Sequence, residues 1–294
     1  MIIVDTVAAL RAALDARGKG LVGFVPTMGF LHEGHRSLMN EARRACEVVV
    51  VSIFVNPKQF GPQEDLSRYP RDLARDRALC EAAGVDVLFV PSVSEMYPPG
   101  FSTEVAVSSA LTDKLCGAFR PGHFTGVTTV VARLLNLVRP DRAYFGQKDF
   151  QQWRVLSQMV RDLAIPTEIV RCPIVREEDG LALSSRNTYL SAEDRAAALR
   201  LSRALGLLLR EASEGPLPEA LAAARAYLEA EPRLTVQYLE AVDVDALAPA
   251  AVAGPGTVAL VAAQVGTTRL IDNAILDPHG PDAALVALAP KETR

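Results

Sequence analysis

Short apolar runs alternate with helical patterns through the first two thirds of the chain, and this alternation constrains the fold more than any other feature. The clearest run, residues 48–55, is almost continuously β-branched or aromatic, as expected of a central parallel strand covered on both faces. Parallel strands need helical crossovers, so the pattern predicts an α/β fold with a doubly wound parallel sheet. The predicted strands lie at 21–25, 48–55, 85–90, 143–145 and 168–170, and the predicted helices at 35–46, 73–83, 127–138 and 150–163.

The character of the sequence changes after about Asn187, where motif-poor helical segments rich in Ala, Leu and Arg begin. Helices followed by consecutive strands indicate a smaller α+β domain. We therefore predict two domains, residues 1–186 and residues 187–294. The second should contain helices at 190–213 and 217–231, strands at 236–242, 257–265 and 269–276, and a surface loop at 248–256.

Charge and cysteine content exclude several classes of protein. The 31 basic and 35 acidic residues give a net charge of −4, without the basic surplus of a non-specific nucleic-acid-binding protein. The four cysteines form no C-x-x-C pair, which indicates buried thiols in a reducing compartment. Asp5 and Arg11 interrupt any amino-terminal signal peptide, and no apolar run approaches the ~20 residues that cross a bilayer. We expect a soluble, cytoplasmic protein without a nucleic-acid or membrane partner.

The segment 26–35, PTMGFLHEGH, carries the sharpest chemical signal. It lies between a predicted strand and an amphipathic helix, whose start would direct backbone N–H groups and a positive dipole end at an anion such as phosphate. His32 and His35 would lie near one another on the first turn and could donate hydrogen bonds to phosphate oxygens. Zinc binding and a purely structural turn are the alternatives. The helical zinc motif spaces its histidines four apart, whereas these are three apart with Gly34 between them.

Other polar segments also follow predicted strands, where ligands of doubly wound sheets collect. In 56–61, NPKQFG, the amides of Asn56 and Gln59 could contact hydroxyl and carboxylate groups, or the segment could be an ordinary turn. Lys148, at a strand-to-helix junction, could neutralise phosphate, and its unfavourable place near a helix start favours an anionic partner. The segment 183–187, LSSRN, follows a predicted turn at 178–180 instead, and it offers several donors to a polyphosphate or is a polar linker. We interpret His123, in RPGHFTG, as structural.

Taken together, these segments resemble the pantoate–β-alanine ligase (pantothenate synthetase) family over essentially the whole chain. PTMGFLHEGH is similar to that family's variant of the HIGH motif of adenylate-forming nucleotidyltransferases. The family's other motifs follow in order as VSIFVNPKQF, YPRDL, RPGHFTGV, YFGQKDFQQ, GLALSSRN and RLIDN. The resemblance implies a Rossmann-like domain, a smaller C-terminal domain that covers the site, and a homodimer. It also implies an ATP- and Mg²⁺-dependent condensation of pantoate with β-alanine through a pantoyl adenylate, with release of AMP and pyrophosphate.

The resemblance also implies roles for individual residues. His35 would donate a proton, His32 would contact phosphate and Lys148 would bind the ATP phosphates. Gln59 would contact pantoate and β-alanine, and Gln152 would contact pantoate. The ligands of Mg²⁺ are not identified by the resemblance. The nucleotide site would comprise Met28, Gly29, Phe30, Leu31, His32, Glu33, Gly34, His35, Gly146, Gln147, Lys148, Asp149, Val175, Leu183, Ser184, Ser185 and Arg186.

Two positions depart from the family pattern: Gln147 and Cys116 stand where glutamate is usual. Hydrolase and P-loop functions lack their key residues, since neither G-x-S-x-G nor G-x-x-x-x-G-K-[ST] occurs in a fitting context. Two alternatives stay open. One is another nucleotidyltransferase, which keeps the nucleotide in its product, and the other is a nucleotide-binding regulatory protein without catalysis.

Overall fold

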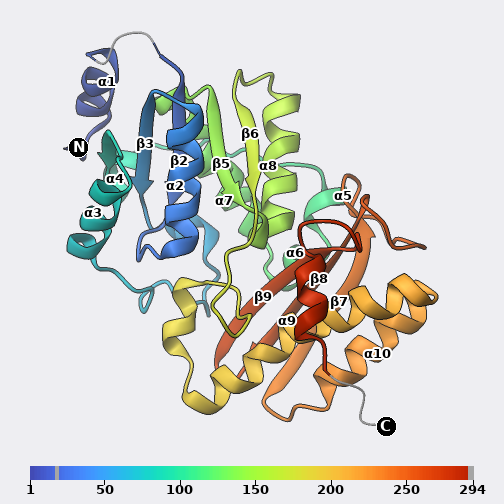
Figure 1. Cartoon of the computed structure of the whole chain (residues 1–294). Helices are drawn as coiled ribbons and strands as arrows, with labels where there is room; N and C mark the ends of the chain where they lie inside the picture. Colours follow the sequence, from blue (N-terminus) through green and yellow to red (C-terminus); the bar gives the residue numbers. More distant parts are fainter. Residues whose placement is uncertain (17–19, 291–294) are drawn as a thin grey trace. The chain divides into compact units, whose positions relative to one another are not determined.

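The computed structural model describes residues 1–16 and 20–290 (Figure 1). The chain divides into two compact units. The first unit contains Met1–Gln147 and Gln151–Cys172, and the second contains Lys148–Phe150 and the chain from Pro173 onward. The division therefore comes earlier than the predicted boundary after Arg186, because residues that follow Pro173 pair with one another and bond to the last strand of the chain. It also assigns Lys148 to the second unit.

The first unit is built on a six-stranded sheet in which all pairs are parallel, with the order β1-β4-β3-β2-β5-β6. The predicted α/β fold is confirmed. Each predicted strand is present within a few residues, whereas the edge strand β1 was not predicted. The strands are β1 Ile2–Val4, β2 Val22–Thr27, β3 Val48–Ile53, β4 Val87–Phe89, β5 Arg142–Gly146 and β6 Glu168–Cys172.

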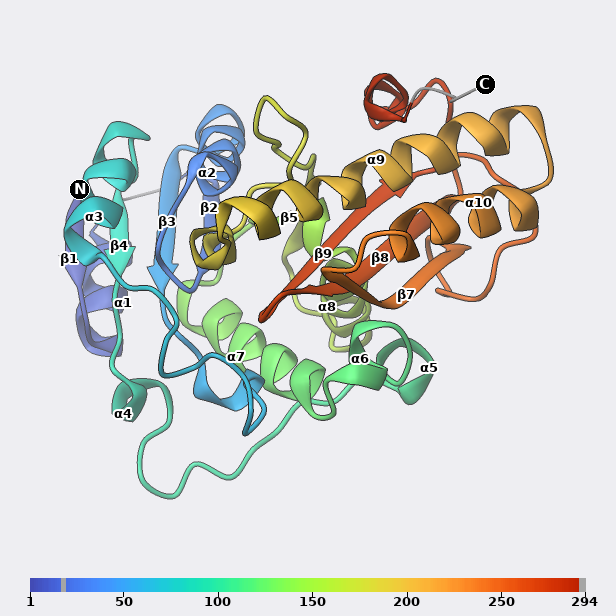
Figure 2. The same ribbon diagram turned by 90° about the horizontal axis from the view of Figure 1, so that it is seen from below.

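Strand β3 shows why its sequence is continuously apolar. Successive side chains of a strand point to opposite faces. Val48 and Val50 join one hydrophobic cluster with Leu135 of α7, and Val49 and Val51 join another with Met39 of α2. Figure 2 shows α2 and α7 on opposite sides of this sheet. Both faces are therefore covered, as a doubly wound sheet requires.

Four of the helices in this unit were predicted: α2, α3, α7 and α8. Helix α1 was not predicted, and α4, α5 and α6 have only four residues each, too few to show a 3.6-residue period. The helices are α1 Val7–Asp15, α2 Glu33–Ala45, α3 Leu73–Ala82, α4 Val93–Met96, α5 Ser109–Thr112, α6 Cys116–Phe119, α7 His123–Val138 and α8 Phe150–Asp162. Two 3₁₀ turns follow β3 and β5: η1 Pro57–Gln59 and η2 Gln147–Asp149.

The second unit is α+β, as predicted. Its antiparallel sheet has the order β7-β8-β9, and residues of α9 and α10 share one hydrophobic cluster with β7, β8 and β9. A bulge between Val236 and Tyr238 shifts the pairing of β7 with β8. The elements are η3 Ser185–Tyr189, α9 Ala192–Glu214, α10 Leu217–Glu229, β7 Leu234–Asp243, β8 Thr257–Val265, β9 Thr268–Ile275 and η4 Ala283–Leu288.

The four cysteines are buried and form no disulfide, which confirms the prediction of buried thiols. None of the helices within residues 1–16 and 20–290 combines the length and apolar character needed to span a membrane.

Candidate active site

The parallel sheet reverses its direction of winding at β2, which pairs with β3 on one side and with β5 on the other. Ligands of such sheets bind beyond the carboxyl ends of the strands at this switch point. The chain leaves β2 at Thr27 and β5 at Gly146. The segments that begin with Met28 and Gln147, both predicted to bind nucleotide, therefore start at the switch point.

The backbone after β2 makes a tight left-handed turn. Gly29 has φ +83° and Phe30 has φ +51°, a region that favours glycine. A Cβ on Gly29 would lie 2.9 Å from Cγ2 of Ile53 and 3.1 Å from Oδ2 of Asp76, so a side chain has no space there. Thr27 supports the turn, because its hydroxyl accepts from the N–H of Gly29 at 3.2 Å. The structure therefore requires glycine at position 29 for two reasons: its positive φ and the lack of space for a Cβ atom.

Asp76 of α3 holds this turn from the side. Its carboxylate accepts the backbone N–H of Phe30 at 2.8 Å and that of Leu31 at 2.7 Å. The side chain is buried, and burial raises the pKa of Asp76 above its ordinary value although both N–H bonds act to lower it. The guanidinium of Arg75 lies 5.2 Å from the centre of the Phe30 ring. Sequence reasoning missed Asp76, because 46 residues separate it from Phe30.

Helix α2 begins with a reciprocal cap made by two histidines. Nδ1 of His32 accepts the N–H of Gly34 at 3.2 Å, and Nδ1 of His35 accepts the N–H of His32 at 3.3 Å. The centres of the two rings lie 4.1 Å apart. This confirms the prediction that two histidines three residues apart lie near one another here. Because both Nδ1 atoms act as acceptors, the neutral rings carry their protons on Nε2. Two N–H donors thus accompany the positive end of the helix dipole.

The segment after β3 reaches the same turn through Gln59. Its Nε2 lies 3.3 Å from Sδ of Met28, so the structure brings a predicted substrate residue beside a predicted nucleotide residue. Of the two alternatives for this segment, the contacts of Asn56 favour the turn, because its oxygen accepts the N–H of Lys58 at 3.3 Å. It is 1% exposed, its oxygen accepts from the Tyr97 hydroxyl at 2.7 Å, and its amide donates to Oε1 of Gln59 and to the carbonyl of Gly126. Asn56 therefore positions Gln59.

The interpretation of His123 as structural agrees with its contacts. Nη1 of Arg120 can only donate, so Nε2 of His123, 2.9 Å away, must accept. Nδ1 then carries the proton and donates to the backbone carbonyl of Gln59 at 2.9 Å. Arg120 also donates to both carboxylate oxygens of Glu64, at 2.7 and 2.6 Å. Burial alone would raise the pKa of Glu64, but the ion pair with Arg120 holds it below the ordinary value.

Gln151 and Gln152 lie in the first turn of α8, and the side chain of Gln151 is used in hydrogen bonds within the protein. Its oxygen accepts the N–H of Cys116 at 2.9 Å, and its amide donates to the carbonyls of Leu111 and Lys114, both at 2.9 Å. Gln152, the predicted pantoate residue, is only half-buried. The backbone of Cys116, where the family usually has glutamate, is thus fixed by a side chain of the first unit.

In the second unit, the predicted nucleotide residues Val175 and Leu183 lie side by side, because the N–H of Leu183 donates to the carbonyl of Val175 at 3.0 Å. The chain between them turns at Gly180, which has φ +95°. Ser184 then caps the 3₁₀ turn η3, with its hydroxyl 3.3 Å from the N–H of Arg186. The structure therefore brings these residues together as one segment, residues 175–187, which we call the serine segment.

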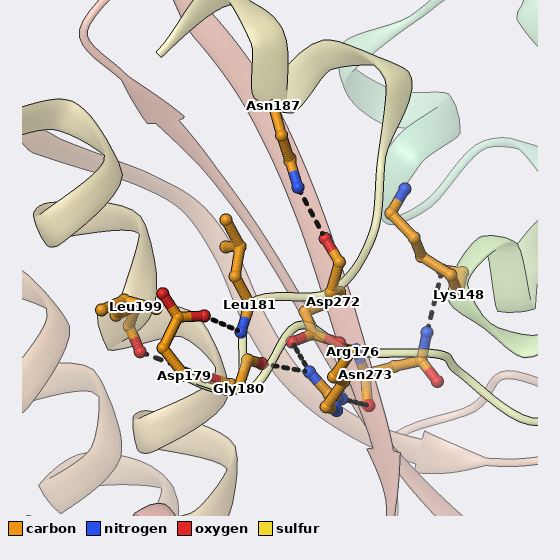
Figure 3. A network of polar contacts seen from close by, with 11 residues as sticks. Lys148, Arg176, Asp179, Gly180, Leu181, Asn187, Leu199, Asp272 and Asn273 are labelled. Atoms are coloured by element: carbon orange, nitrogen blue, oxygen red, sulfur yellow. Dashed lines mark hydrogen bonds and ion pairs between the residues drawn. The ribbon is translucent and has the colours of Figure 1, made fainter. Parts of the chain in front are cut away.

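Lys148 is attached to strand β9 in the same unit (Figure 3). The amide nitrogen of Asn273 donates to the backbone carbonyl of Lys148 at 2.9 Å. The neighbouring Asp272 forms a two-bond ion pair with Arg176, at 2.7 and 2.9 Å. Asp272 and Asn273 end the segment RLIDN, for which the sequence alone indicates no role.

Comparisons with known proteins agree with this architecture. A family model described as pantoate-beta-alanine ligase matches residues 2–275. Pantothenate synthetase from Moorella thermoacetica is 53% identical over 281 residues, covering 94% of this chain and 99% of the relative. The solved pantothenate synthetase of Thermus thermophilus has a TM-score of 0.91 at 54% identity, covering 95% of this chain and all of that one. Pantoate-beta-alanine ligase from Francisella tularensis, complexed with beta-gamma ATP and beta-alanine, has a TM-score of 0.80 at 35% identity, covering 96% and 99%.

Proposed function

This chain belongs to the pantoate–β-alanine ligase family, and we propose that it condenses pantoate with β-alanine to form pantothenate in two steps. First, the pantoate carboxylate attacks the α-phosphorus of ATP; a P–O bond forms and pyrophosphate leaves. Second, the neutral amine of β-alanine attacks the acyl carbon of pantoyl adenylate. The amide bond forms, AMP leaves and the amine loses a proton.

The start of α2 carries this proposal. A carboxylate is a poor acyl donor until its oxygen leaves as part of AMP, and adenylation brings two anions together while charge moves onto pyrophosphate. His32 and His35 each hold Nδ1 in a backbone hydrogen bond and therefore keep a proton on Nε2. Donors fixed before the reaction stabilise developing charge without reorganisation. We assign His35 to proton donation, made from Nε2 as a hydrogen bond to the charge that develops on pyrophosphate, and His32 to phosphate binding.

The other proposed site residues can be grouped by the reactant that each would bind. We propose that Gln59 binds pantoate and β-alanine and that Gln152 binds pantoate, through the donor and acceptor of each amide. Met28–His35 and Gly146–Asp149 would bind ATP, with Lys148 on its phosphates. Val175 and Leu183–Arg186 would complete the nucleotide site. ATP would enter as its Mg²⁺ complex, since Mg²⁺ is held largely by substrate phosphates and retains several waters.

We also propose that the enzyme works as a homodimer in the cytoplasm. The free, buried thiols support a reducing compartment. Sedimentation of the purified protein tests the assembly directly, and a single species of monomer mass over a wide concentration range would contradict it.

Isotope exchange tests the adenylate mechanism. Labelled pyrophosphate should enter ATP when pantoate and Mg²⁺ are present and β-alanine is absent, because the first step is reversible on the enzyme. Adding β-alanine should then release AMP and pantothenate. Products of ADP and phosphate would exclude an adenylate, and exchange that requires β-alanine would exclude the two-step order. An enzyme that retains nucleotide in its product would release no AMP, and a regulatory protein would release at most one pyrophosphate per chain.

A further inference from the structure

We infer that Asn273 is a positioning residue for Lys148, so that β9 holds both proposed phosphate-binding segments of the second unit. The inference rests on the proposed role of Lys148 on the ATP phosphates. It also assigns a structural role to the RLIDN motif, none of whose residues has a proposed role in the reaction.

The backbone of Lys148 is held by a buried amide. The side chain of Asn273 has no exposed surface, and its Nδ2 lies 2.9 Å from the carbonyl oxygen of Lys148, 125 residues earlier in the chain. Figure 3 shows the side chain of Lys148 running away from Asn273 while its carbonyl is bonded to that residue. The bond to the carbonyl oxygen fixes the peptide group next to the Cα atom of Lys148. Because the side chain is long, a small rotation at this Cα atom would displace the ammonium group by a larger distance.

The serine segment is held by the neighbouring residue of β9. Arg176 makes its two bonds with Asp272 where the exposed fractions are 15% and 2%, so water competes little for the pair. The same guanidinium donates to the carbonyl of Gly180 at 3.2 Å, which fixes the turn that leads into Leu183. Oδ1 of Asp272 also accepts the N–H of Asn273 at 2.8 Å.

The strand itself sets the distance between these two attachments. Consecutive residues of a strand direct their side chains to opposite faces, so Asp272 and Asn273 can reach two different segments. Strand β9 is an edge of the β7-β8-β9 sheet and is held in register by β8, with Asp272 opposite Val261 and Asn273 opposite Leu260. Two neighbouring side chains on one paired strand therefore hold Lys148 and the serine segment at a fixed separation. The separation between the donors of Lys148 and those of the serine segment would therefore be fixed before a triphosphate binds to both.

A double-mutant cycle tests this inference, with Asn273→Ala, Lys148→Ala and the double variant. The measurement is the single-turnover rate of pyrophosphate release with saturating ATP and pantoate. Displacement of a reacting group by about 1 Å costs on the order of 100-fold, so we expect Asn273→Ala to lower the rate by ~10- to 100-fold. If Asn273 acts through Lys148, Asn273→Ala in the Lys148→Ala background should lower the rate by less than about twofold.

Thr257→Ala is the matched control for folding. Thr257 is a buried polar residue of β8 in the same unit, and its hydroxyl donates to the carbonyl of Val252 at 2.9 Å. This control should lower thermal stability without changing the rate. Should Asn273→Ala fail to fold, Asn273→Ser, which keeps a donor on a shorter side chain, is measured in the same cycle and judged by the same criterion.

The outcomes separate the inference from the proposed function. A loss of equal size in both backgrounds, or a normal rate in folded Asn273→Ala, overturns the positioning role of Asn273 and leaves that of Lys148 intact. Normal turnover by Lys148→Ala overturns the phosphate role itself, and the inference with it. A loss confined to the chain that still has Lys148 supports both.

Discussion

The turn after β2 is held by a carboxylate that accepts two backbone N–H groups, whereas Lys148 is held by an amide that donates to a backbone carbonyl. The turn also receives local help, because His32 and His35 cap the helix that follows it. Lys148 is held by β9 across 125 residues. Local hydrogen bonds leave a trace in residue spacing, and distant ones do not. The first arrangement is therefore partly readable from the sequence, and the second is not.

The largest effect should come from breaking the buried ion pair of the second unit. Asp272→Asn leaves Arg176 charged, mostly buried and without its anionic partner, which costs about 3–5 kcal/mol of unfolding free energy. Urea denaturation measures this loss. Glu229→Gln is the control, since it makes the same acid-to-amide change in the exposed pair with Arg225 and should cost at most about 1 kcal/mol. Equal losses in the two variants would show that the Arg176 pair contributes no more than a surface pair.

Two substitutions at His35 separate the helix cap from the chemistry. Glutamine at the third helical position can cap α2 as a capping box does, so His35→Gln should fold with nearly normal stability. It lacks the imidazole Nε2, and kcat should fall by about 10²–10³-fold, as for loss of one preorganised donor. His35→Ala should lose the helix cap, which lowers stability, and should also show the reduced kcat. A near-normal kcat in His35→Gln would contradict proton donation by His35.

Asp76→Asn tests the distant support of the turn after β2. An amide has only one acceptor oxygen, so the N–H of Phe30 or Leu31 would lose its partner, at a cost of about 1–3 kcal/mol. The KM for ATP should rise as the turn loosens. Asp72→Asn, on the same helix, is the control, since asparagine caps α3 as well as aspartate does. If both variants gave the same KM and stability, Asp76 would not support the turn.

The smallest effects should appear in the pH dependence of stability, with opposite signs for two acids of the first unit. The pKa of Asp76 is raised on folding, so between its ordinary and folded values the native chain holds a proton that the unfolded chain has released. Its contribution to stability therefore falls as pH rises through the folded pKa. The pKa of Glu64 is lowered, so its contribution is present above the ordinary value and is lost as pH falls through the folded pKa.

Urea midpoints across the acid range check these signs. Relative to the parent protein, Asp76→Asn should show a steeper rise of stability with pH, and Glu64→Gln a shallower one. Parallel curves for all three proteins would contradict both pKa directions.

The sequence by itself determined the α/β class, the α+β character of the second unit and most elements. The hydrophobic period is set by the backbone geometry of helix and strand, and it survives in any tertiary context. The strand at 257–265 has the predicted bounds, and the paired histidines of α2 lie together as their spacing required.

Only the tertiary structure decided which polar side chains support the binding segments. Asp76 and Asn273 look like ordinary residues of a helix and a strand until the fold places them against a backbone group far away in sequence. For Asn56 the sequence left a substrate contact and an ordinary turn open, and the structure shows its amide bonded to Gln59. The grouping of Lys148 with the second unit was hidden for the same reason. A hydrogen bond between distant residues depends on where the whole chain brings them, and no local spacing records that.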